Sequence, residues 1–249
     1  MAPRRLAFWA CLLIMAAPIL IPHAQGDQVG DVQCLAPATC PNLMVDPSTT
    51  MPKTSVETFS ISSCAVVEGA TQAGARTLLR FTFTTPNVGP GDVMIGDPAL
   101  RPDLFEYSTC HGHYHFKKYA AYRLWTPTAF AEWDKLRKVY VDELPDRILQ
   151  EHPDLTNGLV TGAKRGFCMI DVKEYSGNAL PGKYSDCNHL QGITAGWADE
   201  YGAQIEGQWI DVTGLPPGPY VLETEVNAER LLTETNYADN RAWVDVDLT

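Results

Sequence analysis

Residues 208–226 read Gln-Trp-Ile-Asp-Val-Thr-Gly-Leu-Pro-Pro-Gly-Pro-Tyr-Val-Leu-Glu-Thr-Glu-Val, and they indicate the fold more clearly than the rest of this 249-residue chain. Apolar and polar side chains alternate over 208–212 and again over 220–226, which is the period of a half-buried strand. The Pro- and Gly-rich residues 214–218 between them are typical of a turn. Another alternating run at 242–248 ends the chain. Three such runs predict neighbouring strands of a β-sandwich.

The rest of the chain predicts a mainly β architecture with little helix. Residues 129–140 have helical spacing and lack Pro and Gly, and 144–149 either extend that helix or form a short second one. Residues 152–206 are weakly patterned, and loops this long in a compact domain are usually functional or cross-linked. We therefore expect a β-sandwich core with long disulfide-linked loops and one or two short helices. Runs rich in β-branched and aromatic residues predict further strands at 58–62, 77–84 and 119–125.

The N-terminal residues have the pattern of a secretory signal. Arg4 and Arg5 precede an apolar stretch at 6–21, and small residues at 24–26 suit a cleavage site. The apolar run is short for a spanning helix and contains Pro18, so cleavage is favoured over a retained anchor. We expect a protein that is secreted or held in the cell envelope, with no stable membrane span once the signal is removed.

The sequence divides into a signal peptide at 1–26, an extended lead-in at 27–56 and a single domain at 57–249. The formal net charge is −11, and cleavage of the signal would remove two arginines and no acidic residue. An acidic exported protein repels nucleic acid and attracts basic partners. Because 45% of the residues are hydrophobic and 20% are charged, the chain can bury an ordinary core.

Cysteines in the exported part of the chain predict disulfide bonds, because they are even in number. The residues alone leave the pairing open. No Cys-x-x-Cys pair is present, which disfavours a zinc ribbon or a thioredoxin-type site. The cysteines are Cys34, Cys40, Cys64, Cys110, Cys168 and Cys187.

Residues 110–115 read Cys-His-Gly-His-Tyr-His and hold half of the six histidines of the chain. On one strand, His111, His113 and His115 would share a face, which suits a transition metal because neutral imidazole binds copper, zinc, iron and nickel. In a straight strand the outer pair stands about 13 Å apart, so both rings reach one ion only if the strand bends. Gly112 is the residue that would permit the bend. The histidines alone leave zinc open as the metal.

The motif at 110–115 is part of a longer pattern that resembles the lysyl oxidase family. The run Ala-Lys-Arg-Gly-Phe-Cys-Met-Ile-Asp at 163–171 is similar to the family's segment for the cofactor lysine. The run Asp-Glu-Tyr-Gly-Ala-Gln-Ile-Glu-Gly-Gln-Trp-Ile-Asp at 199–211 is similar to its segment for the cofactor tyrosine. Because the segments follow the family's order over roughly residues 40–249, they are far stronger evidence than H-x-H-x-H alone. Further similarity lies at Tyr119 with 122–124, at 212–220 and at 234–240.

The resemblance implies an amine oxidase with two cofactors. One is lysyl tyrosylquinone, which is built from the enzyme's own side chains, and these roles fall on Lys164 and Tyr201. The implied reaction converts a primary amine, first of all peptidyl lysine, to an aldehyde, with molecular oxygen as oxidant and release of ammonia and hydrogen peroxide. Desolvation of Lys164, aided by repulsion from Arg165, would keep its amine neutral and nucleophilic. The other cofactor is copper, held by His111, His113 and His115.

The resemblance also implies a disulfide between Cys110 and Cys187, which would tie the metal strand to the long loop. The pairs Cys34–Cys40 and Cys64–Cys168 then remain. The family's bridge around the cofactor tyrosine is missing here, because Trp197 and Gly207 occupy those two positions.

Residues 234–240, Glu-Thr-Asn-Tyr-Ala-Asp-Asn, offer a cluster of side-chain oxygens. Hard oxygen ligands suit calcium, and some members of the family bind calcium at the corresponding positions. An acidic turn before the last strand is the equal alternative. The oxygen donors are Glu234, Asn236, Asp239 and Asn240.

Two further questions stay open at this level. Asp199, Asp211 and His189 are candidates for the catalytic base, and the sequence does not choose among them. An exported copper-binding β-sandwich without oxidase activity is the alternative to the enzyme.

Overall fold

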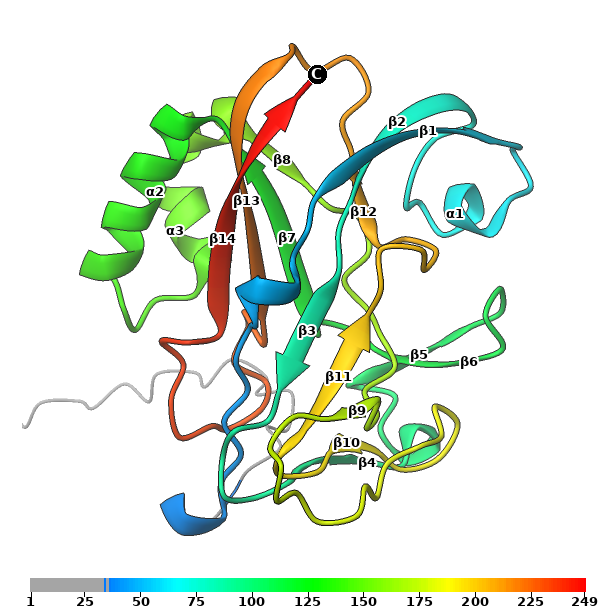
Figure 1. The fold of residues 1–249 in the computed structure, drawn as a ribbon, viewed down its shortest axis with the longest axis vertical. Helices are drawn as coiled ribbons and strands as arrows, with labels where there is room; N and C mark the ends of the chain where they lie inside the picture. The colour runs from blue at the N-terminus through cyan, green and yellow to red at the C-terminus, as the bar shows by residue number, and fades with distance from the viewer. Residues whose placement is uncertain (1–33, 35) are drawn as a thin grey trace, which may run out of the picture.

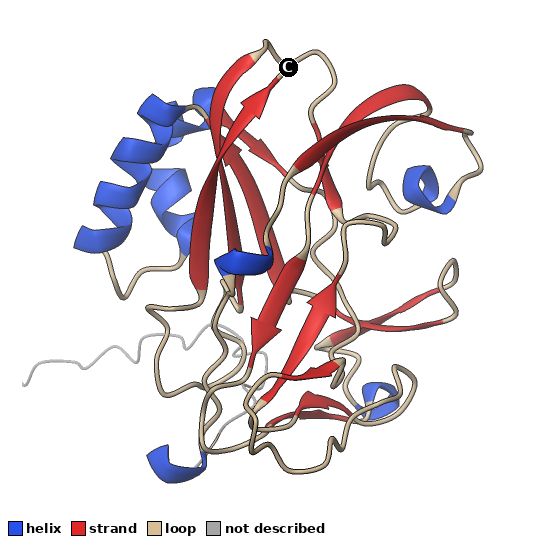
Figure 2. Ribbon diagram, viewed as in Figure 1, coloured by secondary structure: helices blue, strands red, loops and turns tan. Residues whose placement is uncertain are grey.

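The computed structural model describes residues 34 and 36–249, so the expected signal peptide at 1–26 lies outside the described residues. Strands arranged in small sheets dominate, which confirms the mainly β class (Figures 1 and 2). Among the described residues, every helix is too short or too polar to span a bilayer.

The strands are distributed over the whole described chain. In order they are β1 (Lys53–Phe59), β2 (Gly74–Arg80), β3 (Phe83–Pro86), β4 (Val93–Gly96), β5 (Phe105–Ser108), β6 (His113–Phe116), β7 (Ala120–Trp125), β8 (Leu159–Thr161), β9 (Lys173–Glu174), β10 (Gln191–Ile193), β11 (Trp197–Tyr201), β12 (Trp209–Asp211), β13 (Gly218–Val226) and β14 (Arg241–Leu248). The α-helices are α1 (Cys64–Val67), α2 (Pro127–Val139) and α3 (Pro145–Glu151), and 3-10 helices lie at Pro37–Thr39, Pro47–Thr49, Pro98–Leu100 and Pro153–Gly158.

The largest sheet has the order β14-β13-β7-β8, and one of its faces packs on the smaller sheets β1-β2-β12 and β3-β11-β9. Leu222 of β13 and Tyr122 of β7 enter the main core with Phe83 of β3 and Ile210 of β12. The ring of Tyr122 meets that of Phe83 edge-on at 5.2 Å between centroids. The sheets therefore enclose one shared core, as the alternation at 208–226 predicts.

The opposite face of the largest sheet is covered by α2 and α3, on the left of Figure 1. Trp125 and Val221 pack there against Trp133 and Leu136 of α2. Because side chains of a strand alternate between faces, β7 is buried along its whole length. The helix α2 begins at Pro127 after Thr126, whose side chain accepts a hydrogen bond from the Ala129 N–H and caps the helix.

Beneath α2, the fully buried Glu223 of β13 is held by two indoles. Trp125 and Trp133 each donate an indole N–H to its carboxylate, at 2.9 Å. Arg241 of β14 forms an ion pair with it at 3.0 Å. Buried charges persist only when they are paired and hydrogen-bonded, and this carboxylate meets both conditions.

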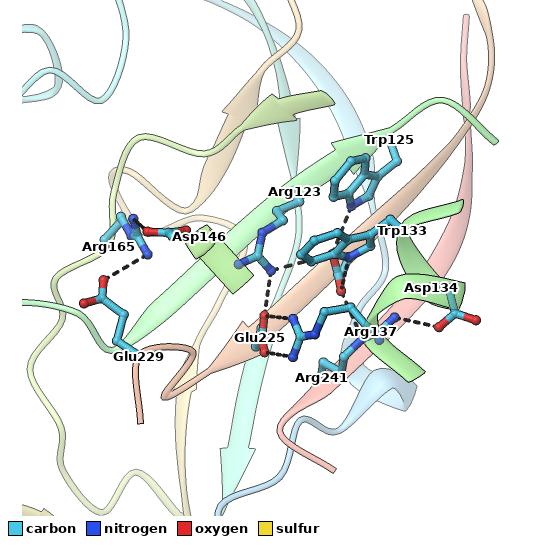
Figure 3. Close-up of polar contacts among 11 residues, drawn as sticks. Arg123, Trp125, Trp133, Asp134, Arg137, Asp146, Arg165, Glu225, Glu229 and Arg241 are labelled. Atoms are coloured by element: carbon cyan, nitrogen blue, oxygen red, sulfur yellow. Dashed lines mark hydrogen bonds and ion pairs between the residues drawn. The ribbon is translucent and has the colours of Figure 1, made fainter. Parts of the chain in front are cut away.

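Glu225, two residues further along β13 and on the same face of the sheet, pairs with two arginines. Arg123 of β7 donates to it at 2.6 Å, and Arg137 of α2 binds both of its oxygens at 2.7 and 3.0 Å (Figure 3). Burial raises the pKa of Glu225, but Arg123 and Arg137 lower it more strongly, to below its ordinary value of 4.5. The ion pair between Arg137 and Glu225 fixes α2 on the sheet.

Several local predictions need correction. Only the start of the expected strand at 58–62 is extended, because β1 ends at Phe59. A turn follows, in which the backbone N–H and the hydroxyl of Ser63 both donate to the Ser60 carbonyl. The run at 77–84 divides between β2 and β3. The weakly patterned stretch 152–206 holds four short strands of the described chain, β8 to β11. Leu43 and Val45 of the expected lead-in are buried in the main core.

The structure joins Cys34 with Cys40, as expected, but the partner of Cys110 differs from the expected one. Cys110 bonds to Cys64, at a Cα separation of 5.6 Å, and not to Cys187. The reason is that α1 packs on the turn between β5 and β6, where the Ser108 hydroxyl donates to the carboxylate of Glu68.

Cys168 is bonded to Cys187, with Cα atoms 5.4 Å apart, and not to Cys64. Gln191 holds the two segments together, because its side chain accepts from the Met169 N–H and donates to the Cys187 carbonyl. The long loop is therefore closed on itself.

Replacing Glu225 with Ala is expected to lower the free energy of unfolding by about 3–5 kcal/mol at pH 7, because Arg123 and Arg137 lose their buried partner. The pKa of Glu225 is lowered in the fold, so its contribution is present above 4.5 and is lost as the pH falls below that value. The difference between the two proteins should therefore narrow in urea unfolding series of decreasing pH.

The matched control is Glu132→Ala, since Glu132 pairs with the exposed Lys135 on the outer side of α2. We expect it to change the free energy of unfolding by less than about 0.5 kcal/mol. Equal unfolding curves for the Glu225 and Glu132 variants would show that the buried pair does not stabilise the helix–sheet contact.

Candidate metal and cofactor site

The three histidines lie at the end of the β5–β6 hairpin. His113 and His115 are on β6, opposite Ser108 and Glu106 of β5, whereas His111 lies in the preceding turn. Gly112 between them has φ +70°, a left-handed conformation that glycine adopts without strain. The expected bend at Gly112 is confirmed, and it turns His111 back toward the two strand histidines.

The ring nitrogens of the three histidines converge. Nε2 of His115 lies 3.1 Å from Nε2 of His113 and 3.4 Å from Nδ1 of His111. One nitrogen of each ring lies within 4.8 Å of the corresponding nitrogens of the other two rings. Among the described residues, these three side chains form the group that could hold a metal ion. Three neutral imidazoles facing one point form a donor set that fits copper or zinc.

The surroundings favour neutral rings. Burial lowers the pKa of His115 to about 3, with a further contribution from the positive charge of Lys164. Burial also lowers the pKa of His113, below its ordinary value of 6.5, with help from His111. A metal binds only the neutral form of imidazole, so these shifts favour metal over proton.

Lys164 is placed beside the histidines by an antiparallel pairing of backbone segments. Phe116, the last residue of β6, exchanges hydrogen bonds with Phe167, at 2.7 and 3.1 Å. The Tyr119 N–H donates to the Arg165 carbonyl at 3.0 Å. The residue after Arg165 is Gly166, whose Cα packs so closely on His115 that an added Cβ would lie 3.3 Å from the histidine Cβ.

The ammonium of Lys164 contacts the ring of Phe167 and the carbonyl of Glu206. Its Nζ is 5.0 Å from the centroid of Phe167, and it donates to the Glu206 carbonyl at 3.1 Å. Burial lowers the pKa of Lys164 below its ordinary value of 10.5, against the attraction of Glu68 and Glu206. Gly207, at φ +79°, leaves room for the lysine, since a Cβ there would lie 2.5 Å from the lysine Cδ.

Arg165 does not face the lysine. Its guanidinium binds Glu229 at 3.3 Å and lies 3.7 Å from Asp146, on the α3 side (Figure 3). The expected contribution from Arg165 is therefore wrong, whereas burial, the main cause expected, does lower the pKa of Lys164.

Tyr201 is the last residue of β11, and its ring packs on Phe167 at 4.5 Å between centroids. Its hydroxyl donates to the Cys168 carbonyl. The ring of Phe167 thus contacts both the amine of Lys164 and the ring of Tyr201.

A single pocket of about 420 Å³ connects these groups. The three histidines, Lys164 and Tyr201 all line it, together with Asp199, two residues before Tyr201 on the same face of β11. Ile170, Val172 and Ile205 contribute an apolar part of the wall. The pocket thus combines a metal-binding donor set, a desolvated amine and a phenol.

Comparison with known proteins supports the resemblance noted in the sequence. The family description "Lysyl oxidase" matches residues 44–135 and 151–249, well over half of the chain. The chain belongs to the lysyl oxidase family. Residues 136–150 of this lysyl oxidase family member, which include the end of α2 and the start of α3, lie outside the match.

Named relatives agree with this assignment. Protein-lysine 6-oxidase of Homo sapiens is 29% identical over 222 residues, which cover 84% of this chain and 46% of the human protein. Lysyl oxidase homolog 1 of Homo sapiens is 28% identical over 191 residues, 76% of this chain and 28% of that protein. Protein-lysine 6-oxidase of Sus scrofa is 29% identical, over 84% of this chain and 77% of the porcine sequence. The chain thus spans less than half of either human relative.

Of the three candidates for the base, the structure brings only Asp199 into the pocket of this lysyl oxidase family member. Asp211 binds Arg76 at 2.8 Å and accepts from the Thr71 hydroxyl, and it does not line the pocket. His189 is exposed and pairs with Asp186.

Two acidic residues near the histidines were not singled out in the sequence. The carboxylate oxygens of Glu68 and Glu206 lie 3.7 and 3.9 Å from Nε2 of His111. Glu68 follows α1, a helix too short to show a periodic pattern, so no local signal in the sequence relates it to residue 111. Phe167 was quoted only as part of the lysine segment, and its contact with both cofactor candidates is visible only in the fold.

Three of the four expected calcium donors, Glu234, Asp239 and Asn240, lie close to the buried backbone around Leu43. Glu234 is buried and accepts from the Leu43 N–H and from the amides of Asn227 and Asn240. Burial raises its pKa to about 7 against these hydrogen bonds. A carboxylate in this position prefers either a proton or a nearby cation.

Two of the neighbouring side-chain oxygens have no hydrogen-bond donor. Asp239 accepts from the Asn42 amide through one oxygen at 2.9 Å, while its Oδ1 and the Oδ1 of Asn240 are buried without a hydrogen-bond partner. Asn236 is exposed and accepts from the Ala238 N–H in a local turn. The unpartnered oxygens fit an oxygen-ligated cation.

We predict that His113→Ala abolishes stoichiometric copper binding, because the remaining two rings leave the ion without one of its three imidazoles. The control is His189→Ala, which removes an exposed histidine outside the pocket. Metal analysis after dialysis against copper should give one ion per chain for wild type and for the control. Equal copper contents in both variants would contradict the assigned donor set.

Proposed function

We propose that this protein is a copper-dependent amine oxidase that converts primary amines, with peptidyl lysine as the favoured substrate, to aldehydes, ammonia and hydrogen peroxide. The observation that carries the proposal is the single pocket lined by the three histidines, Lys164 and Tyr201. The names of the relatives, which include protein-lysine 6-oxidase, support the same activity. The acidic chain, of net charge −11, favours encounter with a cationic lysine side chain. We also propose that the protein is exported, as its disulfides suit.

Copper together with a quinone made from Lys164 and Tyr201 would supply the electrophilic carbonyl and accept the two electrons of amine oxidation. His111, His113 and His115 would hold the copper. Lys164 contributes an amine whose pKa is lowered by burial, so that the neutral, nucleophilic form is accessible. Phe167 contacts both the amine of Lys164 and the ring of Tyr201, and so positions the two side chains around one phenyl group.

Asp199 is the proposed base that removes the proton from the substrate's α-carbon. It is 1% exposed, and neither of its carboxylate oxygens makes a hydrogen bond. Burial raises its pKa well above its ordinary value of 3.8. A carboxylate with a raised pKa is a stronger base, which suits proton abstraction in a pocket lined by apolar side chains.

The test is reaction of the copper-loaded, air-exposed protein with phenylhydrazine and with a lysine-containing peptide. We expect a coloured adduct and peroxide release, and we expect Lys164→Met and Tyr201→Phe to give neither. Asp199→Asn should form the adduct but release peroxide at least about 100-fold more slowly, because only turnover needs the base. The controls Lys135→Met and Tyr107→Phe change exposed side chains outside the pocket.

A copper-loaded wild type that forms no adduct would overturn the oxidase. The protein would then be a copper-binding β-sandwich without oxidase activity.

We also propose that calcium binds beside Glu234, Asp239 and Asn240. Calcium addition should raise the melting temperature, because the ion satisfies the unpartnered Oδ1 atoms of Asp239 and Asn240. Asp239→Ala should remove the calcium-dependent rise, whereas Asp245→Ala, on β14, should keep it. A melting temperature that does not respond to calcium would refute the site.

A further inference from the structure

One nitrogen of the metal-binding histidines has no partner. Nε2 of His111 is buried and makes no hydrogen bond, although the other nitrogen of the ring, Nδ1, faces Nε2 of His115 at 3.4 Å. His113 and His115, in contrast, turn their Nε2 atoms toward each other at 3.1 Å. The three rings thus present Nδ1, Nε2 and Nε2 to the same point.

This arrangement fixes the proton on His111. If Nδ1 is the ligand, Nε2 must carry the hydrogen, because a neutral imidazole has one N–H. A metal-binding histidine almost always donates its other N–H to a carboxylate, a carbonyl or water, and that partner sets the ring orientation. A buried N–H without an acceptor costs free energy, so the neighbours of Nε2 matter.

Two carboxylates flank this nitrogen. Glu68 Oε2 lies 3.7 Å from Nε2 of His111, and Glu206 Oε2 lies 3.9 Å from it. Both distances slightly exceed hydrogen-bond length, and a small rotation of either carboxylate would bring it into range. Glu68 is the nearer of the two and the less exposed, with 30% of its side chain accessible against 44% for Glu206.

Glu68 is held in place from the other side. Its Oε1 accepts from the Ser108 hydroxyl, whose oxygen in turn accepts from the backbone N–H of His111 at 3.0 Å. Glu68 caps α1, and the disulfide Cys64–Cys110 ties the start of that helix to the residue before His111. The Ser108 hydroxyl thus links the Glu68 carboxylate to the backbone of His111, and the disulfide holds the start of α1 beside the same residue.

The first turn of α1 holds the second carboxylate as well. The Ala65 N–H donates to Glu206 Oε1 at 2.9 Å, and the Glu206 carbonyl accepts from Lys164. The short helix is therefore linked through Glu206 to the lysine side of the pocket as well.

We propose that Glu68 is a positioning residue that accepts the Nε2–H of His111 and so orients its Nδ1 toward the copper ion. The proposal rests on the copper site of the proposed function, but not on the quinone or on amine oxidation. It gives α1 and the disulfide Cys64–Cys110 a role at the metal, since both hold Glu68 against the hairpin.

The test measures copper(II) affinity, by competition with a chromophoric chelator, and the electron paramagnetic resonance spectrum of the bound ion. Glu68→Ala should weaken binding by about 10- to 100-fold and alter the copper hyperfine splitting. Glu68→Asp keeps the charge but is one methylene too short, so it should weaken binding nearly as much. Glu68→Gln keeps an acceptor oxygen at the same reach and should restore most of the affinity and the spectrum.

The matched control is Glu106→Gln, which removes a negative charge from the adjoining cavity of about 360 Å³ but is not in contact with Nε2 of His111. It should bind copper as wild type does. Wild-type affinity and spectrum in Glu68→Asp would overturn the proposal, as would equal weakening in Glu68→Gln and Glu106→Gln, which would reduce the effect to charge. The Asp and Gln variants decide the matter even if Glu68→Ala does not fold.

The outcome is separable from that of the oxidase. Wild type that binds copper but forms no phenylhydrazine adduct would defeat the proposed enzyme and leave the role of Glu68 testable by affinity. Copper-dependent peroxide release together with unchanged binding in all Glu68 variants would support the enzyme and refute Glu68 as the positioning residue.

Discussion

The backbone pairing of Phe116 with Phe167 is the contact on which the pocket depends. It joins the end of the histidine strand to the lysine segment, so that His115 and Lys164 approach each other although 49 residues separate them in sequence. The ring of Phe167 then supports both the lysine amine and the ring of Tyr201. Loss of this pairing would separate the three histidines from Lys164 and Tyr201.

Around that pairing, charge and burial act together. The pocket desolvates Lys164 and the strand histidines, which favours their neutral forms, while the carboxylates of Glu68 and Glu206 lie close to His111. The largest sheet contributes a rigid support, because its far face is fixed to α2 by fully paired buried charges. Residues 136–150, which lie outside the family match, complete that helical cover and not the pocket.

Much of this was predictable from local sequence. The alternation at 208–226 and 242–248 indicated the strands of the largest sheet and its neighbour, and Gly112 marked the bend. The cysteine pairing and the roles of Glu68 and Phe167 were not, because they arise from contacts between segments far apart in the chain. Resemblance to a family carried Lys164 and Tyr201, whereas the choice of Asp199 over Asp211 and His189 required the burial and the partners of each carboxylate or ring.

The most direct test is peptide mass spectrometry of the protein after exposure to copper and oxygen. The account predicts a covalent link between the peptide that contains Lys164 and the peptide that contains Tyr201, formed in wild type and missing in a variant that cannot hold copper. Recovery of both peptides separate and unmodified from fully copper-loaded, oxygen-treated wild type would contradict it.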